Sequence, residues 1–191
     1  MKVGLFLGSF NPVHIGHLAI ANYFAEFSDL EQIWLVISPQ SPFKQKKNLL
    51  PEYQRYHMVE LALGDDHQIR PSNIEFLLPK PSYTIDTLAY LREKHPSNQF
   101  CLILGSDNLV HFHKWKNYRE LLSHYELYVY PRPGHDPQAF RDQYDFHWWD
   151  APLIEISSSM IRRSIQQGKN MRYFLPVKVY EYIREMHFYE K

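Results

Sequence analysis

Short runs of apolar residues recur along the chain, and each run is followed by glycine, serine or proline. The runs lie at residues 3–7, 33–37, 100–104, 127–130 and 153–156. Apolar runs of this length that stop at turn-forming residues are typical of strands buried on both faces. We therefore predict five buried strands at these positions.

The segments between these runs show the spacing of helices. After Gly16, the apolar residues Leu18, Ala21 and Phe24 recur at helical spacing. Similar signals predict helices at residues 16–28, 51–63, 84–94, 118–122, 159–166 and 176–187. Strands that alternate with helices form parallel βαβ units. The pattern predicts an α/β fold with one domain over residues 1–191: a doubly wound, Rossmann-like parallel sheet with helices on both faces, and a C-terminal helical part from about residue 157.

Composition narrows the class of protein. Lys and Arg number 21 and Asp and Glu also number 21, so the basic excess usual in binders of nucleic-acid polymers is missing. The single cysteine, Cys101, excludes an internal disulfide, and its apolar surroundings favour a small buried side chain. No segment has the length of a membrane span, and the first residues do not form a secretion signal. We expect a cytoplasmic protein that does not use a membrane.

The most informative segment joins the first predicted strand to the first predicted helix. It reads Gly8-Ser9-Phe10-Asn11-Pro12-Val13-His14-Ile15-Gly16-His17. Ligands of doubly wound sheets bind beyond the carboxyl ends of the strands, which is where this segment lies. Gly8 lets the backbone turn tightly, and the amides that begin the helix can hold a phosphate. His14 and His17 are three residues apart, so both imidazoles can face one anion.

Two other interpretations of the histidine pair stay open. The pair could serve only to cap the helix. It could also bind zinc, although no cysteine or carboxylate lies close to it in the sequence.

A second segment of the same kind follows the last predicted strand and reads Ile156-Ser157-Ser158-Ser159-Met160-Ile161-Arg162. Serines at a helix start can donate to phosphate oxygens, and an arginine one turn later offers a forked donor. Taken alone, an ordinary helix cap with a solvated arginine explains the segment better. Together with the first segment, it predicts two phosphate sites that face one cleft. Neither segment contains the patterns of P-loop kinases or of dinucleotide-dependent dehydrogenases.

The two segments also resemble a known family. Residues 8–17 resemble the Gly-x-Phe-x-Pro-x-His-x-Gly-His signature of the nucleotidylyltransferase superfamily, and residues 156–162 resemble its late Ile-Ser-Ser/Thr-x-x-x-Arg motif. Residues 81–88, residues 105–107 with Trp115, and residues 173–176 are similar to segments of bacterial nicotinate-nucleotide adenylyltransferases. The resemblance spans nearly the whole chain. It departs at Leu7, Asn11 and Phe43, where the family often has glycine, aspartate and histidine.

The resemblance implies an enzyme that joins the adenylyl group of ATP to nicotinate mononucleotide and releases pyrophosphate, with Mg²⁺ accompanying the triphosphate. It implies that His14, His17 and Arg162 are the catalytic residues and that no side chain binds the metal directly. His17 would contact the α-phosphate and Asp107 a ribose hydroxyl. The implied ATP-binding residues are Gly8, Ser9, Phe10, His14, Gly16, His17, Lys44, Gly105, Asp107, Ile156, Ser158, Ser159 and Arg162.

The resemblance also implies a pocket for the mononucleotide. Tyr83 and Thr84 would line it, Trp115 would stack on the pyridine ring, and Arg132 would help to bind the mononucleotide.

Three rivals stay open. A sister transferase would use nicotinamide mononucleotide, pantetheine phosphate or a cytidylyl donor, and the segment around Tyr83 together with Trp115 speaks against pantetheine. A non-catalytic nucleotide-binding module and a zinc-binding protein are the other two. The sequence leaves the oligomeric state open, including a homo-oligomer.

Overall fold

One parallel sheet organises the molecule. The computed structural model describes residues 1–40 and 49–190. Six strands within these residues pair in the order β3-β2-β1-β4-β5-β6, and all five pairings are parallel. The strands are β1 (Lys2–Gly8), β2 (Gln32–Ile37), β3 (Ile69–Ser72), β4 (Gln99–Gly105), β5 (Leu127–Tyr130) and β6 (His147–Trp148). The chain winds outward from β1 in both directions, so the predicted doubly wound α/β fold is confirmed.

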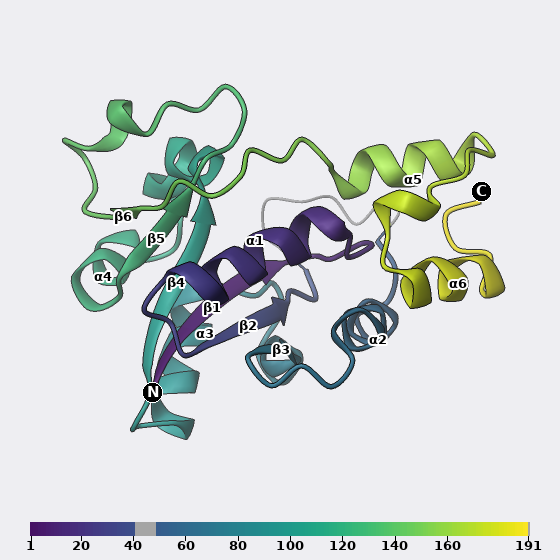
Figure 1. Ribbon diagram of the computed structural model, residues 1–191. Coiled ribbons are helices and arrows are strands. Elements are labelled where there is room, and N and C mark those ends of the chain that lie inside the picture. The colour runs from purple at the N-terminus through teal and green to yellow at the C-terminus, as the bar shows by residue number, and fades with distance from the viewer. Residues whose placement is uncertain (41–48, 191) are drawn as a thin grey trace.

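Helices cover both faces of the sheet (Figure 1). The α-helices are α1 (Ile15–Phe27), α2 (Glu52–Leu63), α3 (Thr84–Lys94), α4 (Tyr118–His124), α5 (Ser158–Gln166) and α6 (Val177–Glu185). Short 3-10 helices are η1 (Ile74–Leu77), η2 (Ser106–Lys114), η3 (Pro137–Phe140) and η4 (Arg172–Phe174). Buried residues of α1, α2, α5 and α6 share one hydrophobic cluster, and those of α3, α4 and η2 share another.

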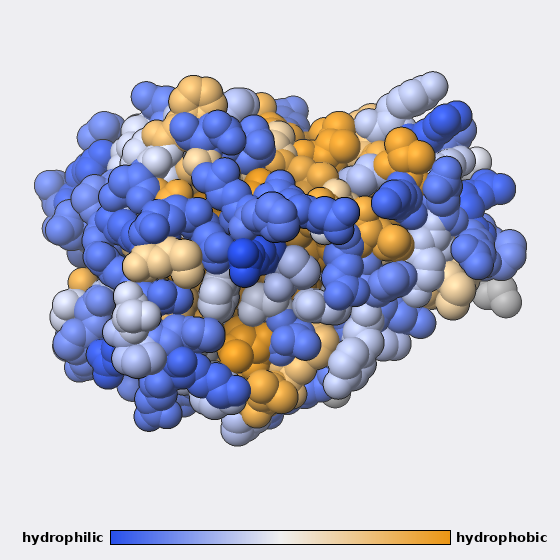
Figure 2. Space-filling view, turned by 60° about the horizontal axis from the view of Figure 1, so that its bottom comes forward, coloured by the Kyte–Doolittle hydropathy of each residue, from blue (hydrophilic) through white to orange (hydrophobic). Residues whose placement is uncertain are grey.

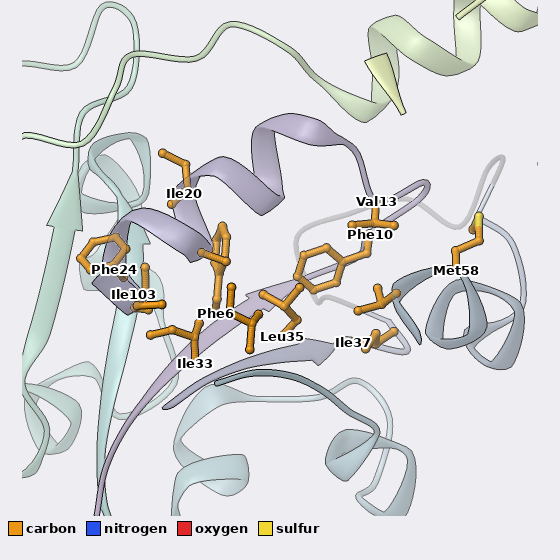
Figure 3. Close-up of a cluster of buried hydrophobic side chains, with 14 of the residues drawn as sticks. Phe6, Phe10, Val13, Ile20, Phe24, Ile33, Leu35, Ile37, Met58 and Ile103 are labelled. Carbon is orange, nitrogen blue, oxygen red and sulfur yellow. The ribbon is translucent and has the colours of Figure 1, made fainter. Parts of the chain in front are cut away.

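The two clusters follow from the alternation of side chains along the strands. In β4, Cys101 and Ile103 belong to the first cluster, whereas Phe100, Leu102 and Leu104 belong to the second. Figure 3 shows the first cluster, in which side chains of α1 meet those of the strands below it. Residues 100–104 of this strand are therefore all apolar, as expected for a parallel sheet covered on both faces.

The prediction of a strand at residues 153–156 is wrong. Leu153 is exposed, and Ile154 and Ile156 pack from outside the sheet against the first cluster. The segment leads from β6 to α5 without pairing with a strand, and the Ile154 carbonyl accepts a hydrogen bond from Arg132 Nη1 at 3.3 Å. Its residues are apolar because they pack against the core, and not because they belong to the sheet.

Two edge strands were not predicted. β3 contains Arg70 and Pro71, and β6 is only two residues long, so neither forms an apolar run. Proline is tolerated at an edge because one side of an edge strand needs no ladder hydrogen bonds. The 3-10 helix η2, directly after β4, was also missed.

The surface of the molecule is mainly hydrophilic on one face (Figure 2). On the face shown in Figure 2, hydrophilic residues cover most of the surface, and hydrophobic residues gather in a few separate groups. In the described parts of the chain, no helix is both long and apolar enough to cross a membrane.

Phe24 on α1 provides a test of the first cluster. Its side chain is 0% exposed, whereas Phe27 on the same helix is 68% exposed. We expect Phe24→Ala to lower the free energy of unfolding by about 3–5 kcal/mol, because it leaves a cavity between α1 and the sheet. Phe27→Ala should cost less than about 1 kcal/mol. Urea denaturation of the three proteins measures both values, and similar losses would contradict this view of the core.

Candidate active site

The predicted phosphate-binding residues meet at the carboxyl ends of the strands. They line a cavity of about 440 Å³. Its walls contain all the residues that the family resemblance implied for ATP and that the structure describes: Gly8, Ser9, Phe10, His14, Gly16, His17, Gly105, Asp107, Ile156, Ser158, Ser159 and Arg162. Lys44 and Phe43 lie outside the described residues. The two segments singled out in the sequence therefore face one cavity, as expected.

The loop between β1 and α1 is held by Phe10. This residue has a left-handed backbone with φ of 43°, and its side chain is 1% exposed. Its ring points from the loop toward the strands (Figure 3) and packs edge-on against Phe6 and His17. A Cβ on Gly8 would lie 2.9 Å from the Phe10 ring, so the loop needs glycine there. Phe10 thus anchors the loop in the core.

His14 and His17 lie against each other at the start of α1. Their rings stack with centroids 3.7 Å apart, and the His14 backbone amide donates to His17 Nδ1 at 3.3 Å. His14 is 4% exposed, and burial, together with the positive charge of Arg132, lowers the pKa of His14 to about 4. His14 is therefore neutral at physiological pH. Its Nδ1 atom is buried and faces the His17 amide in a capping box at the start of α1, without a hydrogen bond of good geometry.

Gly16 explains how residues 153–156 come close to this pair. A Cβ at Gly16 would lie 2.9 Å from Ile154 Cγ2 and 3.1 Å from His14 Nδ1. The glycine allows the segment to close over the start of α1, where Ile154 and Ile156 form part of the cavity wall.

The start of α5 is tied to the first loop. Ser157 caps the helix by accepting from the Met160 amide at 3.2 Å. The next side chains reach across to the loop, 146 and 151 residues earlier: Ser158 Oγ donates to the Pro12 carbonyl at 2.9 Å, and Arg162 Nη1 donates to the Asn11 carbonyl at 2.7 Å. Arg162 Nη2 also contacts Ser159 Oγ at 3.3 Å. Neither Arg162 nor Ser158 is merely solvated.

Asn11 stands where the family often has aspartate, and its contacts show the effect of this difference. Its Oδ1 atom accepts from the Tyr189 hydroxyl at 2.7 Å and from the Leu50 amide at 3.3 Å. Both bonds need only an acceptor at this position, which an aspartate would also supply. The amide therefore preserves the contacts of the loop.

Asp107 and Arg132 form the opposite wall. Asp107 follows β4 and Arg132 follows β5, and Arg132 Nε lies 3.9 Å from Asp107 Oδ1. A Cβ on Gly105 would lie 2.5 Å from Asp107 Oδ1 and 2.7 Å from Arg132 Cγ, so glycine makes room for the pair. Arg132 lines the first cavity, although the resemblance implied that it binds the mononucleotide.

A second cavity of about 450 Å³ adjoins the first. Its lining includes Tyr83, Thr84 and Trp115, which the resemblance assigned to the mononucleotide. The Trp115 ring packs against the Phe112 ring, with their centroids 5.1 Å apart. Lys116 Nζ lies 4.7 Å from the centre of the Tyr83 ring. The two cavities share a rim, whose residues are Leu7, Gly8, Ser9, Ser38, Asp107, Asn108 and Trp115.

Sequence reasoning missed Glu75, which lies in the wall of the second cavity. Its side chain is 1% exposed, and burial raises the pKa of Glu75. Thr87 on α3 donates to Glu75 Oε1 at 2.9 Å. Glu75 stands between Ile74 and Phe76 in η1, and a single carboxylate among apolar residues gives no signal that it is buried.

The zinc interpretation finds no support in the geometry. Across residues 1–40 and 49–190, no group of three or more His, Cys, Asp or Glu side chains is arranged to hold a metal ion. Cys101 is buried, and burial raises its pKa to about 12. It is a packing residue, as its sequence context predicted.

Comparisons with known proteins identify the class first. Residues 5–164 match the family model described as cytidylyltransferase-like. The fold agrees: a Plasmodium falciparum nicotinic acid mononucleotide adenylyltransferase, solved in complex with NaAD, superposes with a TM-score of 0.85 over 99% of this chain and 97% of that chain, at 19% identity. The chain is thus of the nucleotidyltransferase class.

Curated relatives identify the family. A Flavobacterium johnsoniae protein named "Probable nicotinate-nucleotide adenylyltransferase" is 51% identical over the full length of both chains. A Bacteroides fragilis protein of the same name is 44% identical and covers 95% of this chain and 90% of its own. The chain belongs to the nicotinate-nucleotide adenylyltransferase family.

The buried imidazole of His14 predicts a pH-dependent stability. Its pKa falls from an ordinary 6.5 to about 4 on folding, so the unfolded chain binds a proton here before the folded chain does. This contribution to stability is complete above the unfolded pKa and is lost as the pH falls toward the folded pKa. Between about pH 7.5 and pH 5, the native protein should lose about 2 kcal/mol more than His14→Gln. Urea denaturation at both pH values measures this difference, and equal losses would show that His14 is not buried neutral.

Proposed function

We propose that this chain transfers the adenylyl group of ATP to nicotinate mononucleotide, giving nicotinate adenine dinucleotide and pyrophosphate in NAD biosynthesis. The observation that carries the proposal is the pair of adjoining cavities with a shared rim at the carboxyl ends of the strands. The family of the chain supports the same reaction. Two substrates that occupy separate cavities and meet at one rim are arranged for transfer from one to the other.

The reaction needs no covalent enzyme intermediate. A phosphate oxygen of the mononucleotide forms a bond to the α-phosphorus of ATP. The bond from that phosphorus to the oxygen bridging to the β-phosphate breaks, and pyrophosphate leaves with the electron pair. The work of the protein is to align two anions and to stabilise the charge that develops between them.

The two histidines act on the side of the first loop. His17 donates to the α-phosphate, and His14 contacts the triphosphate nearby. Because His14 is neutral at physiological pH, it acts as a hydrogen-bond donor and not as a cation.

The start of α5 receives the β- and γ-phosphates. Ser158, Ser159 and Arg162 lie on the cavity wall there. The amides at a helix N-terminus favour an anion, and the guanidinium of Arg162 adds a forked donor. Lys44, predicted to reach the phosphates, remains a prediction from the sequence.

The remaining residues bind the nucleosides. Asp107 accepts from a ribose hydroxyl of the adenylyl group, and Arg132 lies beside it in the first cavity. That Arg132 helps to bind the mononucleotide remains a prediction from the sequence. In the second cavity, Trp115 stacks on the pyridine ring, and Tyr83 and Thr84 hold its substituent.

A divalent cation accompanies the triphosphate, and we propose Mg²⁺. The described residues contain no cluster of three or more side chains suited to hold a metal ion. The site therefore fits a Mg²⁺ bound mainly by phosphate oxygens and water, which is the usual preference of this ion with nucleotides. When bound, Mg²⁺ offsets negative charge on the triphosphate. A cytoplasmic location remains a prediction from the sequence.

Pyrophosphate release tests the reaction and the acceptor. With ATP and Mg²⁺, we expect release with nicotinate mononucleotide to exceed release with nicotinamide mononucleotide or phosphopantetheine by about 10-fold or more, because the acceptors differ in charge and shape at the second cavity. The released pyrophosphate is measured by a coupled assay. Preference for another acceptor would replace the substrate in this proposal. No release with any acceptor would favour a nucleotide-binding module.

Trp115 tests the location of the pyridine ring. Trp115→Ala should weaken binding of nicotinate mononucleotide about 10-fold, because the ring loses its stacking surface, and should change ATP binding much less. Calorimetric titration of each substrate measures both constants. Trp148→Ala is the matched control, since Trp148 bonds Asp150 at 2.6 Å and lines neither cavity. Equal weakening of both substrates by Trp115→Ala would refute the stacking role.

A further inference from the structure

Arg55 on α2 is a buried cation that the proposed chemistry does not use. Its side chain is 0% exposed. It donates to four backbone carbonyls: Nε to Leu50 at 2.8 Å, Nη1 to Ser9 at 2.6 Å and to Ser38 at 2.9 Å, and Nη2 to Pro39 at 3.1 Å. Among the residues described, no carboxylate lies within ion-pair distance of its guanidinium. Four carbonyl dipoles compensate for burying this charge, and the more distant carboxylate of Glu52 adds a favourable charge interaction.

A buried cation without a paired carboxylate lowers the stability of a protein core. Burying a charge costs free energy that a hydrophobic side chain of similar size would not incur. Burial is the main influence on Arg55, and it lowers the pKa of the guanidinium. Packing alone therefore gives no reason for an arginine at this position.

Two of the four carbonyl groups lie directly after the ends of two neighbouring strands. Ser9 follows β1 and Ser38 follows β2, and these strands are neighbours in the sheet. Both residues belong to the rim that the two cavities share. One guanidinium nitrogen, Nη1, therefore holds both strand ends at the junction of the cavities.

The same guanidinium also orients the first loop. In a planar trans peptide, the carbonyl and the following amide point in opposite directions. Because the Ser9 carbonyl points to Arg55, the Phe10 amide points away from it. On the Nε side, Arg55 holds the Leu50 carbonyl, and the Leu50 amide bonds Asn11 Oδ1 of the loop. Arg55 thus acts on the loop at two points.

We propose that Arg55 is a positioning residue for adenylyl transfer: it fixes the shared rim so that the phosphates of the two substrates meet in line. This inference rests on the proposed function and deepens it. Arg55 lines neither cavity, so it acts through Ser9 and Ser38 and touches no substrate. A displacement of about 1 Å at such a junction can lower turnover about 100-fold.

The experiment compares two variants of Arg55 with a control on the same helix. Arg55→Met keeps the length of the side chain and removes all four bonds. Arg55→Lys keeps the charge but replaces the fork with one ammonium. Met58→Ala is the control, because Met58 is 0% exposed on α2 and lines neither cavity. Thermal unfolding shows the folded fraction of each protein, and kcat and both KM values are measured well below the lowest midpoint.

We expect Arg55→Met to lower kcat about 10-fold or more and to raise KM for ATP and for nicotinate mononucleotide in parallel, since the rim belongs to both cavities. Arg55→Lys should recover only part of the loss. Met58→Ala should lose thermal stability and keep the three kinetic constants. If Arg55→Met does not fold, the kinetic constants of Arg55→Lys are compared with those of the native protein and of Met58→Ala.

Two other results have separate meanings. Folded Arg55 variants that keep native kcat and KM while losing stability, as the control does, would overturn the positioning role and leave the proposed function intact. A native protein that releases no pyrophosphate with any of the three acceptors would overturn the proposed function, and with it the role of Arg55 in that reaction.

Discussion

The candidate site depends on how the chain satisfies the backbone carbonyls of Ser9, Asn11 and Pro12. A strand that ends in a tight loop leaves carbonyls without partners in the sheet, and a buried carbonyl without a partner costs free energy. Side chains from α2 and α5 supply the missing donors: Arg55 to Ser9, Arg162 to Asn11 and Ser158 to Pro12. The shape of the loop is therefore fixed by tertiary contacts and not by the local sequence alone. The cavity exists because two distant parts of the chain, α2 and α5, converge on this loop.

Arg162 combines a structural contact with a place at the cavity wall. Its Nη1 atom holds the Asn11 carbonyl, and the remainder of the fork lies at the cavity wall. Arg132 has a comparable double effect, since its charge helps to keep His14 neutral while it also lies beside Asp107. In the first cavity, the described residues Arg132 and Arg162 bring positive charge, whereas the imidazole of His14 is neutral at physiological pH. This division suits a site that must bind a polyanion and then release pyrophosphate.

The sequence predicted the sheet and the segments that bear chemistry more reliably than it predicted edges and buried polar groups. The long apolar runs of β1, β2 and β4 identify the central strands because those strands are covered on both faces. The strand predicted at residues 153–156 was wrong, because a segment that packs against the core from outside the sheet also needs apolar residues. Arg55 and Glu75 gave no signal, because a buried charged residue is recognised only from its partners, and these are backbone carbonyls for Arg55 and Thr87 for Glu75. The roles of individual site residues remain predictions, supported by their placement around the two cavities.

The bond between Tyr189 and Asn11 joins positions 178 residues apart. Together with the contacts of Ser158 and Arg162, it makes the earliest loop of the chain dependent on its latest helices. During synthesis on the ribosome, β1 and its loop emerge first, yet the loop cannot acquire its final partners until the α5 and α6 region has been made. The sheet can therefore assemble progressively, whereas the ability to bind nucleotide arises only at the last stage of folding. A nascent chain of this protein would pass through a stage in which it is folded in part but has no working site.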